Sequence, residues 1–185
     1  MLALDKIGKD WTLFLDRDGV INIEKYQDYV YNYREFIFYE GVPEALAFLS
    51  GIFGPIVMTT NQRGIGRGLM TEADLAGIHQ QMLRDVQAAG GRIDKIYYCP
   101  SNDNSDPNRK PNPGMAFQAK ADFPQIDLQR SLIVGNSISD MEFGRNAGIH
   151  TVFVTTTKPA QAFPHPLIDA VFSGLPDFAK ALQFC

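Results

Sequence analysis

The chain has 185 residues, of which 45% are hydrophobic and 21% charged, a balance typical of one globular domain with a substantial core. A net charge of -4 argues against a surface that holds a nucleic-acid backbone, because such surfaces normally carry a basic patch. The start has no apolar run long enough for a signal peptide or a membrane span. We therefore expect one domain over residues 1–185, cytoplasmic and monomeric, with no nucleic-acid or membrane partner.

Short apolar runs alternate with helix-like stretches along the chain, as in a parallel sheet covered by helices on both faces. The expected strands are 11–15, 55–58, 93–98, 131–134, 151–154 and, more weakly, 170–172. The expected helices are one that begins near Pro43 and ends before Gly51, then 71–89, 114–123, 139–147 and 176–182. The sequence thus predicts a three-layer α/β sandwich with a mainly parallel sheet.

Two longer segments interrupt the alternation. Residues 22–40 are rich in aromatic side chains, and we expect them to form a hairpin or small flap over the sheet edge. Residues 100–113 are polar and rich in Asn, Asp and Pro, which predicts a loop. Neither segment is long enough for a large cap domain. Both should lie near strand ends, where ligands bind in open α/β sheets.

Two carboxylates stand at the end of the first expected strand. Asp16 and Asp18 are separated by one residue and followed by Gly19. A buried strand seldom ends in paired acids unless a cation or a reaction compensates their repulsion. An ordinary Asp-rich turn explains the motif about equally well. The choice between a functional site and a turn therefore depends on the residues at the other strand ends.

Polar groups follow the other expected strands as well. Thr60 and Asn61 precede a glycine-rich loop with Arg63 and Arg67, and glycine amides and arginines are typical ligands of phosphate. The loop at 100–113 ends in two further cations, and the strand at 131–134 leads to an amide and an acid. These last four residues are Arg109, Lys110, Asn136 and Asp140.

Taken in order, these motifs resemble the haloacid dehalogenase-like phosphatases across nearly the whole chain. The sequence is most similar to the branch that includes D-glycero-D-manno-heptose 1,7-bisphosphate phosphatase and the histidinol-phosphatase domain. The matching stretches are Asp-Arg-Asp-Gly-Val-Ile-Asn from 16, Thr-Asn-Gln from 60, and Arg-Lys-Pro-Asn-Pro-Gly-Met from 109. The resemblance implies a Rossmann-like fold, carbohydrate metabolism, and a small phosphorylated metabolite as substrate.

The resemblance also implies roles for the residues that match its motifs. Asp16 would be the nucleophile, and Asp18 the general acid and base. Thr60 and Lys110 would hold the phosphoryl oxygens. Asp16, the Asp18 carbonyl and Asn136 would bind Mg²⁺, with Asp140 in support. Substrate contacts are expected from Asn61, Arg63, Arg67 and Arg109.

The sequence departs from the family at two sites. The fourth motif usually opens with aspartate, whereas this chain has Asn136, so we expect weaker metal affinity rather than an inactive protein. Many relatives hold a structural zinc through Cys-x-His and Cys-x-Cys, but here only Cys99 matches, and tetrahedral zinc sites need all four ligands. We expect no structural zinc, and we expect Cys99 and Cys185 to be free thiols.

Two alternatives stay open on the sequence. The phosphatase module of polynucleotide 3′-phosphatases resembles the same Thr-Asn-Gln and Arg-Lys-Pro stretches, and Asn136 is compatible with a non-catalytic binding protein. Arg63 replaces a serine that is common in the family, which bears on the substrate contact. The three histidines, His79, His150 and His165, form no apparent constellation, and we expect His79 to be a surface or packing residue.

Overall fold

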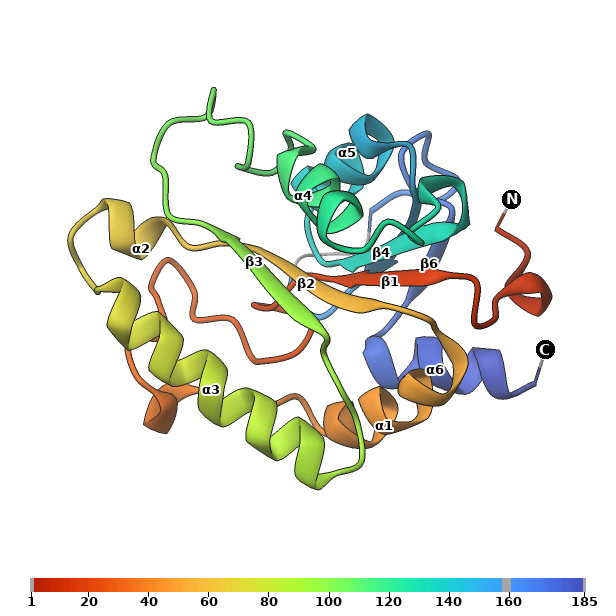
Figure 1. Ribbon diagram of the computed structural model, residues 1–185, viewed down its shortest axis with the longest axis horizontal. Coiled ribbons are helices and arrows are strands. Elements are labelled where there is room, and N and C mark those ends of the chain that lie inside the picture. The colour runs from red at the N-terminus through yellow and green to blue at the C-terminus, as the bar shows by residue number, and fades with distance from the viewer. Residues whose placement is uncertain (1, 158–160, 185) are drawn as a thin grey trace.

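The computed structural model describes residues 2–157 and 161–184, so Cys185 lies outside the described part. The described strands form one sheet with the order β3-β2-β1-β4-β5-β6, in which all neighbouring pairs are parallel. Figure 1 shows helices on both sides of this sheet. The expected three-layer α/β sandwich is confirmed, and over the described ranges the sheet is wholly rather than mainly parallel.

The elements follow one another as strand and helix for most of the chain. The strands are β1 (Thr12–Leu15), β2 (Ile56–Asn61), β3 (Lys95–Cys99), β4 (Ser131–Gly135), β5 (His150–Val154) and β6 (Ala170–Phe172). The helices are α1 (Val42–Ile52), α2 (Arg63–Gly66), α3 (Glu72–Ala88), α4 (Gly114–Asp122), α5 (Ile138–Ala147) and α6 (Leu175–Gln183). Short 3₁₀ segments are η1 (Leu4–Lys6), η2 (Tyr33–Glu35) and η3 (Leu128–Arg130).

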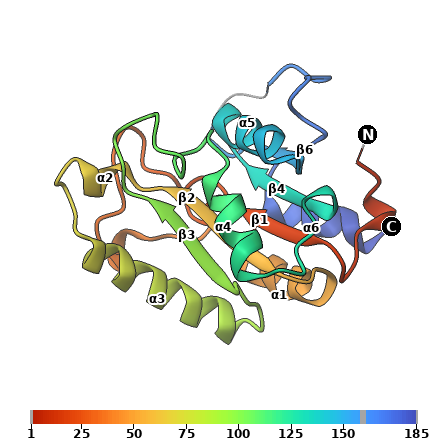
Figure 2. The same ribbon diagram turned by 45° about the horizontal axis from the view of Figure 1, so that its top comes forward.

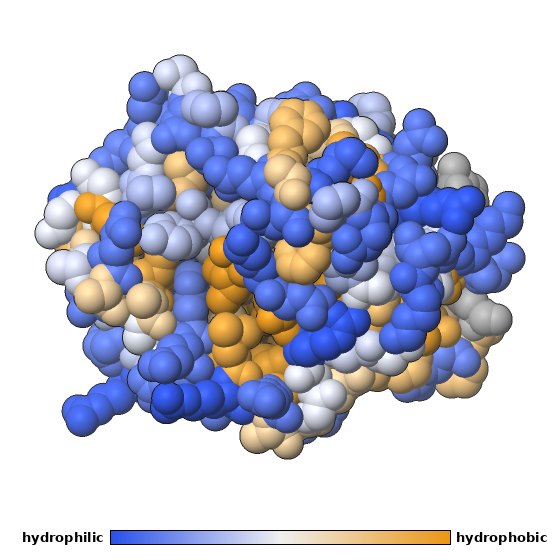
Figure 3. All heavy atoms as spheres, viewed as in Figure 1, coloured by the Kyte–Doolittle hydropathy of each residue, from blue (hydrophilic) through white to orange (hydrophobic). Residues whose placement is uncertain are grey.

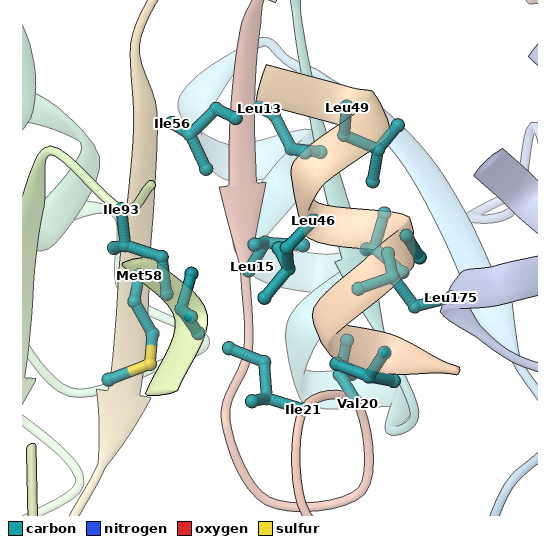
Figure 4. Packing of buried hydrophobic residues seen from close by; sticks show 14 of the residues in the cluster. Leu13, Leu15, Val20, Ile21, Leu46, Leu49, Ile56, Met58, Ile93 and Leu175 are labelled. Atoms are coloured by element: carbon teal, nitrogen blue, oxygen red, sulfur yellow. The ribbon is translucent and has the colours of Figure 1, made fainter. Parts of the chain in front are cut away.

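Side-chain alternation along the strands builds a core on each face of the sheet. In β1, Leu13 and Leu15 pack on one face and Phe14 packs on the other, and all three are fully buried. Helices α1, α3 and α6 cover the first face, whereas α4 and α5 cover the second (Figure 2). Figure 4 shows Leu46 and Leu49 of α1 packed beside β1. This packing fixes β1, and therefore the residues that follow it, at the centre of the molecule.

Of the two structures expected for the aromatic segment 22–40, a hairpin or a small flap, the segment forms a flap. Its two ends meet at an isolated antiparallel bridge between Asn22 and Phe38, and η2 lies between them. Phe36 is buried in the core, and the ring of Tyr33 stacks on it with the two ring centroids 5.4 Å apart. With a 3₁₀ turn and an isolated bridge in place of paired strands, the segment is an irregular flap.

The face seen in Figure 3 is mostly polar, with a hydrophobic band where the edge strand β3 meets α3. Among the described residues, no helix has the length and apolar character that a membrane crossing needs. In the described ranges no inserted domain covers the carboxyl ends of the strands, which the flap and the loop between β3 and α4 adjoin.

Candidate active site

Three neighbouring strands bring polar side chains to one edge of the sheet. Strand β1 lies between β2 and β4, and their carboxyl ends meet because the strands are parallel. Asp16 follows β1, Thr60 lies near the end of β2, and Asn136 follows β4. All three line one pocket, which we call the strand-end pocket.

The strand-end pocket contains most of the residues that the sequence singled out. Those predicted to act in catalysis or metal binding all line it: Asp16, Asp18, Thr60, Lys110, Asn136 and Asp140. Asn61 lines it too, but its amide is engaged on both sides, since Nδ2 donates to the Lys110 carbonyl and Oδ1 accepts from the Lys110 amide, each at 3.0 Å. Asn61 therefore ties the Lys110 loop to the end of β2.

Lys110 is a buried cation between two carboxylates. Its Nζ lies 2.8 Å from Asp16 Oδ1 and 2.6 Å from Asp140 Oδ1, and it donates to the Thr59 carbonyl at 2.8 Å. Burial alone would lower the pKa of Lys110, but the Asp140 and Asp16 carboxylates raise it above its usual value. Burial raises the pKa of Asp16 to about 7, because Lys110 offsets the loss of water only in part and Asp140 adds repulsion.

Asp140 connects this cation to the start of α5. Its Oδ1 accepts from Lys110, and its Oδ2 accepts from both the amide and the hydroxyl of Ser137 in a capping box. Both carboxylate oxygens are therefore bonded within the protein. Gly135 is required beside it, because a Cβ there would lie 2.3 Å from the Asp140 Cβ.

Asp18 is held by an unusual number of donors. The buried Arg17 contacts both of its oxygens at 2.9 Å, and Asn22 and Gln62 each donate to it at 3.0 Å. Burial would raise the pKa of Asp18, but the Arg17 charge and these hydrogen bonds hold it below its usual range. The same Gln62 nitrogen donates to Thr60 Oγ1 at 2.9 Å, which links Asp18 to the hydroxyl of β2.

Of the two roles expected for His79, surface and packing, the structure supports packing, and it adds a buried contact with Arg17. His79 projects from α3, is 7% exposed, and its Nε2 lies 3.2 Å from Arg17 Nη1. Burial, together with the Arg17 charge, lowers the pKa of His79 to about 3. The imidazole is therefore neutral at physiological pH.

Asn136 is oriented by contacts to its amide nitrogen. Nδ2 lies 3.2 Å from Glu24 Oε2 and also donates to the Thr157 hydroxyl. The amide rests directly on Gly19, where a Cβ would lie 1.9 Å from Nδ2, and Gly19 has a φ of +88°. Only glycine fits this position, which gives the Asp-x-Asp-Gly motif a steric reason. With the nitrogen occupied, the Asn136 carbonyl is the part of the amide that can ligate a cation.

The three predicted substrate-binding arginines do not line the strand-end pocket but gather beside it. We call Arg63, Arg67 and Arg109 the arginine cluster. Arg63 and Arg109 both donate to Asn104 Oδ1, at 3.0 and 3.2 Å, and Arg109 also donates to the Ser101 carbonyl. Burial and the charges of Arg63 and Arg67 lower the pKa of Arg109.

The arginine cluster has no acidic partner among the ion pairs of the described residues. Arg63 Nε is buried without a hydrogen-bond partner in this part of the chain. Arg67 lies over the ring of Tyr29, 6.0 Å from its centroid, and Tyr29 lines the strand-end pocket. The cluster thus borders the pocket through this ring.

The glycine-rich loop is not the amide cradle that its sequence suggests. Residues 63–66 form the short helix α2, and the amides of residues 65 to 69 all donate to backbone carbonyls. The side chains of Arg63 and Arg67 are therefore what this loop offers to an anion. Cys99 ends β3 as a buried free thiol, as expected, and burial raises its pKa.

Sequence reasoning did not identify Glu24, Gln62 or His79 as parts of the site. Gln62 stands in a motif that was recognised, so its neighbours offered a signal. Glu24 belongs to the flap, and His79 lies 62 positions from Arg17 in the chain. Only the tertiary structure brings these two to their partners.

Comparison with known proteins finds relatives that cover most of the chain. Residues 107–177 match the HAD-hydrolase-like family. The chain is 34% identical over 182 residues to D-glycero-alpha-D-manno-heptose-1,7-bisphosphate 7-phosphatase of Mycobacterium tuberculosis (strain CDC 1551 / Oshkosh), covering 98% of this chain and 96% of the relative. The D-glycero-beta-D-manno-heptose-1,7-bisphosphate 7-phosphatase of Salmonella typhi is 35% identical and covers 92% of this chain and 94% of its own.

A solved structure is similar over almost the same length. The D,D-heptose 1,7-bisphosphate phosphatase from B. bronchiseptica, crystallised with magnesium and phosphate, superposes with a TM-score of 0.85 at 31% identity, covering 94% of this chain and 98% of that one. The identity, the coverage and the shared fold lead to one conclusion. The chain belongs to the heptose 1,7-bisphosphate phosphatase family of haloacid dehalogenase-like hydrolases.

Proposed function

We propose that the protein hydrolyses a phosphate ester of a sugar bisphosphate through an aspartyl-phosphate on Asp16, with Mg²⁺ as cofactor. The observation that carries the proposal is the environment of Asp16. Its carboxylate lies at the end of the central strand, 2.8 Å from Lys110 Nζ, in the pocket that Thr60 and Asn136 also line. A nucleophile, a fixed cation, a hydroxyl and a metal ligand thus share one small volume.

The reaction would take place in two phosphoryl transfers. An Asp16 oxygen attacks phosphorus, the bond from phosphorus to the sugar oxygen breaks, and the departing alkoxide takes a proton from Asp18. A water molecule then gives a proton to Asp18 and attacks the same phosphorus. Phosphate leaves, and the Asp16 carboxylate is regenerated.

Asp18 has to change protonation during this cycle. The donors around it favour the carboxylate, the form that accepts a proton from water. An incoming phosphate raises the pKa of a neighbouring carboxyl through charge repulsion and so favours the acid form. Arg17, Asn22 and Gln62 keep the group in place through both forms.

Thr60 and Lys110 would hold the phosphoryl oxygens. The Thr60 oxygen accepts from Gln62, so its own proton is directed away from Gln62 and can be donated to a phosphoryl oxygen. Lys110 already contacts Asp16 at 2.8 Å, and a phosphoryl group bonded to that oxygen comes within reach of the ammonium. The lysine charge stabilises the negative charge on the transferring group.

The residues present fit Mg²⁺, which prefers oxygen ligands. Asp16, the backbone carbonyl of Asp18 and the Asn136 carbonyl would hold it. The raised pKa of Asp16 indicates a carboxylate with too little neighbouring positive charge, even beside Lys110. When bound, Mg²⁺ supplies charge that keeps Asp16 ionised and polarises the phosphoryl group. Asn136 provides one negative charge fewer than aspartate, which favours weaker binding.

A second anion on the substrate is supported by the arginine cluster. Three cations with no acidic partner among the described ion pairs, one with a buried unpartnered Nε, border the pocket through Tyr29. Arginine binds phosphate in a bidentate manner. By similarity to the named relatives, heptose 1,7-bisphosphate is the first candidate. Relatives named for the alpha and the beta anomer are 34% and 35% identical to this chain.

A substrate comparison tests this function. Phosphate release is measured with heptose 1,7-bisphosphate, with the matching heptose monophosphate and with a 3′-phosphorylated oligonucleotide, each with Mg²⁺ and with chelator. We expect the highest kcat/KM for the bisphosphate and no turnover with chelator. Preference for the oligonucleotide would favour the polynucleotide alternative, and no turnover on any ester would favour the non-catalytic one.

A further inference from the structure

A chain of three side chains, of which His79 and Arg17 are buried, leads from helix α3 to Asp18 in the strand-end pocket. His79 Nε2 lies 3.2 Å from Arg17 Nη1, while Arg17 Nη2 lies 2.9 Å from both oxygens of Asp18. Arg17 is 1% exposed and His79 is 7% exposed. Water therefore has little access to this guanidinium, and its orientation depends on these two protein partners.

The chemistry of the two groups fixes the direction of the hydrogen bond. A guanidinium carries only donors, so His79 Nε2 must accept from Arg17 and the imidazole proton must be on Nδ1. The low pKa of His79 agrees with this neutral form. His79 thus holds one end of the guanidinium, and the other end, Nη2 and Nε, faces Asp18.

The planarity of the guanidinium transmits this contact. Because its nitrogens form one rigid fork, fixing Nη1 also fixes the plane in which Nη2 and Nε meet the carboxylate. Asn22 and Gln62 donate to Asp18 as well, but each makes a single contact to one oxygen. Arg17 is the partner that spans both oxygens, and its own position is set from α3.

We propose that His79 is a positioning residue, which acts through Arg17 to orient the Asp18 carboxylate toward the oxygen of the leaving alcohol. This inference rests on the proposed role of Asp18 as the group that exchanges a proton with that oxygen. His79 touches neither Asp18 nor the pocket in the described contacts, so it acts only through Arg17. Loss of the imidazole acceptor would leave a buried Nη1 without this partner and would free the fork to turn.

Dependence on the leaving group separates positioning from simple packing. Expulsion of a sugar alkoxide needs a proton from Asp18, whereas an acidic nitrophenol leaves without one. The ratio kcat/KM reports the steps up to departure of the leaving group, so it excludes the later hydrolysis of the aspartyl-phosphate. A packing defect in α3 would lower kcat/KM for both kinds of ester alike.

The experiment compares a sugar phosphate with p-nitrophenyl phosphate in four variants at saturating Mg²⁺. His79→Leu removes the acceptor, His79→Asn keeps polarity but is too short to reach Arg17, and His79→Gln places an amide oxygen near the original Nε2. Ile78→Val is the matched control, since Ile78 is a buried α3 residue of the hydrophobic core. Thermal unfolding of each variant shows that the assays are made on folded protein.

We expect His79→Leu and His79→Asn to lower kcat/KM for the sugar phosphate by roughly tenfold to a hundredfold, and for the aryl phosphate by less than about twofold. His79→Gln should recover most of the loss, and Ile78→Val should leave the ratio of the two substrates unchanged. If His79→Leu does not fold, His79→Asn and His79→Gln still decide the matter.

Equal losses on both esters, no loss, or failure of His79→Gln to recover activity would overturn the inference. Asp18→Asn distinguishes this failure from failure of the proposed function. If Asp18→Asn shows the leaving-group dependence and the His79 variants do not, only the role of His79 is wrong. If Asp18→Asn also lacks that dependence, the proposed role of Asp18 is wrong.

Discussion

The strand-end pocket and the arginine cluster each contain several charged side chains, but their cations have different partners. In the pocket each cation has carboxylate partners, with Lys110 between Asp16 and Asp140 and Arg17 against Asp18. In the arginine cluster, Arg63 and Arg109 share only the neutral Asn104, among the described contacts. Charges compensated within the protein keep reacting groups in place, whereas uncompensated cations are available to an anion from outside.

The nucleophile is the most sensitive point of the pocket. Asp16→Asn should lower kcat by more than about 10⁴-fold, because the amide is a poor nucleophile and the phosphoryl acceptor is lost. Lys110 keeps its contact with Asp140, so the fold should survive, as circular dichroism and thermal unfolding can verify. Substantial steady-state turnover in a folded Asp16→Asn protein would contradict the assignment.

Asp16 and Asp140 lose the charge that compensates them when Lys110 is replaced. Lys110→Met should lower the free energy of unfolding by about 3–5 kcal/mol, because two buried carboxylates lose their partner. Lys95→Met is the matched control, since Lys95 Nζ also lies close to a carboxylate, 2.7 Å from Asp122 Oδ2, but both side chains are more than 40% exposed. Lys95→Met should leave the free energy of unfolding, measured in urea, almost unchanged. Equal losses in the two variants would show that burial does not set the strength of the Lys110 contacts.

The arginine cluster is tested by its effect on substrate choice. Arg63→Ala should lower the ratio of kcat/KM for a sugar bisphosphate to that for the monophosphate by about ten- to a hundredfold, the typical effect of one charge-assisted contact. Arg109→Ala should act similarly but also loosen the loop, because Arg109 holds the Ser101 carbonyl. Arg34→Ala, at an exposed arginine of η2, is the control. An unchanged ratio in Arg63→Ala and Arg109→Ala would mean that the cluster does not bind a second anion of the substrate.

The buried His79 makes the free energy of unfolding of the protein depend on pH. Its pKa falls from 6.5 to about 3 on folding, so between these values the unfolded chain binds more protons and stability decreases as the pH falls. At pH 5 this lowers the free energy of unfolding by about 2 kcal/mol relative to neutral pH. Urea unfolding at both pH values should show this extra loss in the parent and not in His79→Gln. The same pH dependence in both proteins would mean that His79 does not titrate as described.

The smallest expected effect concerns the orientation of Asn136. Glu24→Ala should weaken Mg²⁺ binding by about tenfold, because the amide loses an acceptor that keeps its carbonyl turned toward the metal. Asn136→Asp should strengthen binding by adding a charge. Isothermal titration calorimetry measures both.

Asp28→Ala controls for the general loss of negative charge, since Asp28 lines the pocket and pairs with Lys25. If Asp28→Ala weakens Mg²⁺ binding as much as Glu24→Ala does, the contact between Glu24 and Asn136 has no specific role.

The features that could be predicted from sequence are those that local patterns and parallel strand pairing determine. The strands followed from their apolar runs, and parallel pairing then brought Asp16, Thr60 and Asn136 to one edge. Local sequence cannot show that Arg17 meets His79, because that contact joins two elements across the fold. The short helix α2 was not predicted, because glycine-rich stretches favour loops. Its helical turn is the reason that the amides of residues 65 to 69 donate to backbone carbonyls.

The central claim is that phosphate passes through Asp16, and chemical trapping tests it most directly. The enzyme is mixed with a sugar bisphosphate and Mg²⁺, quenched within one turnover and treated with borohydride, which reduces an acyl phosphate to the alcohol. Peptide mass spectrometry should then find homoserine in place of Asp16, and no conversion at Asp18 or Asp140. Turnover at full rate without any modification of Asp16, or conversion at another carboxylate, would contradict the account.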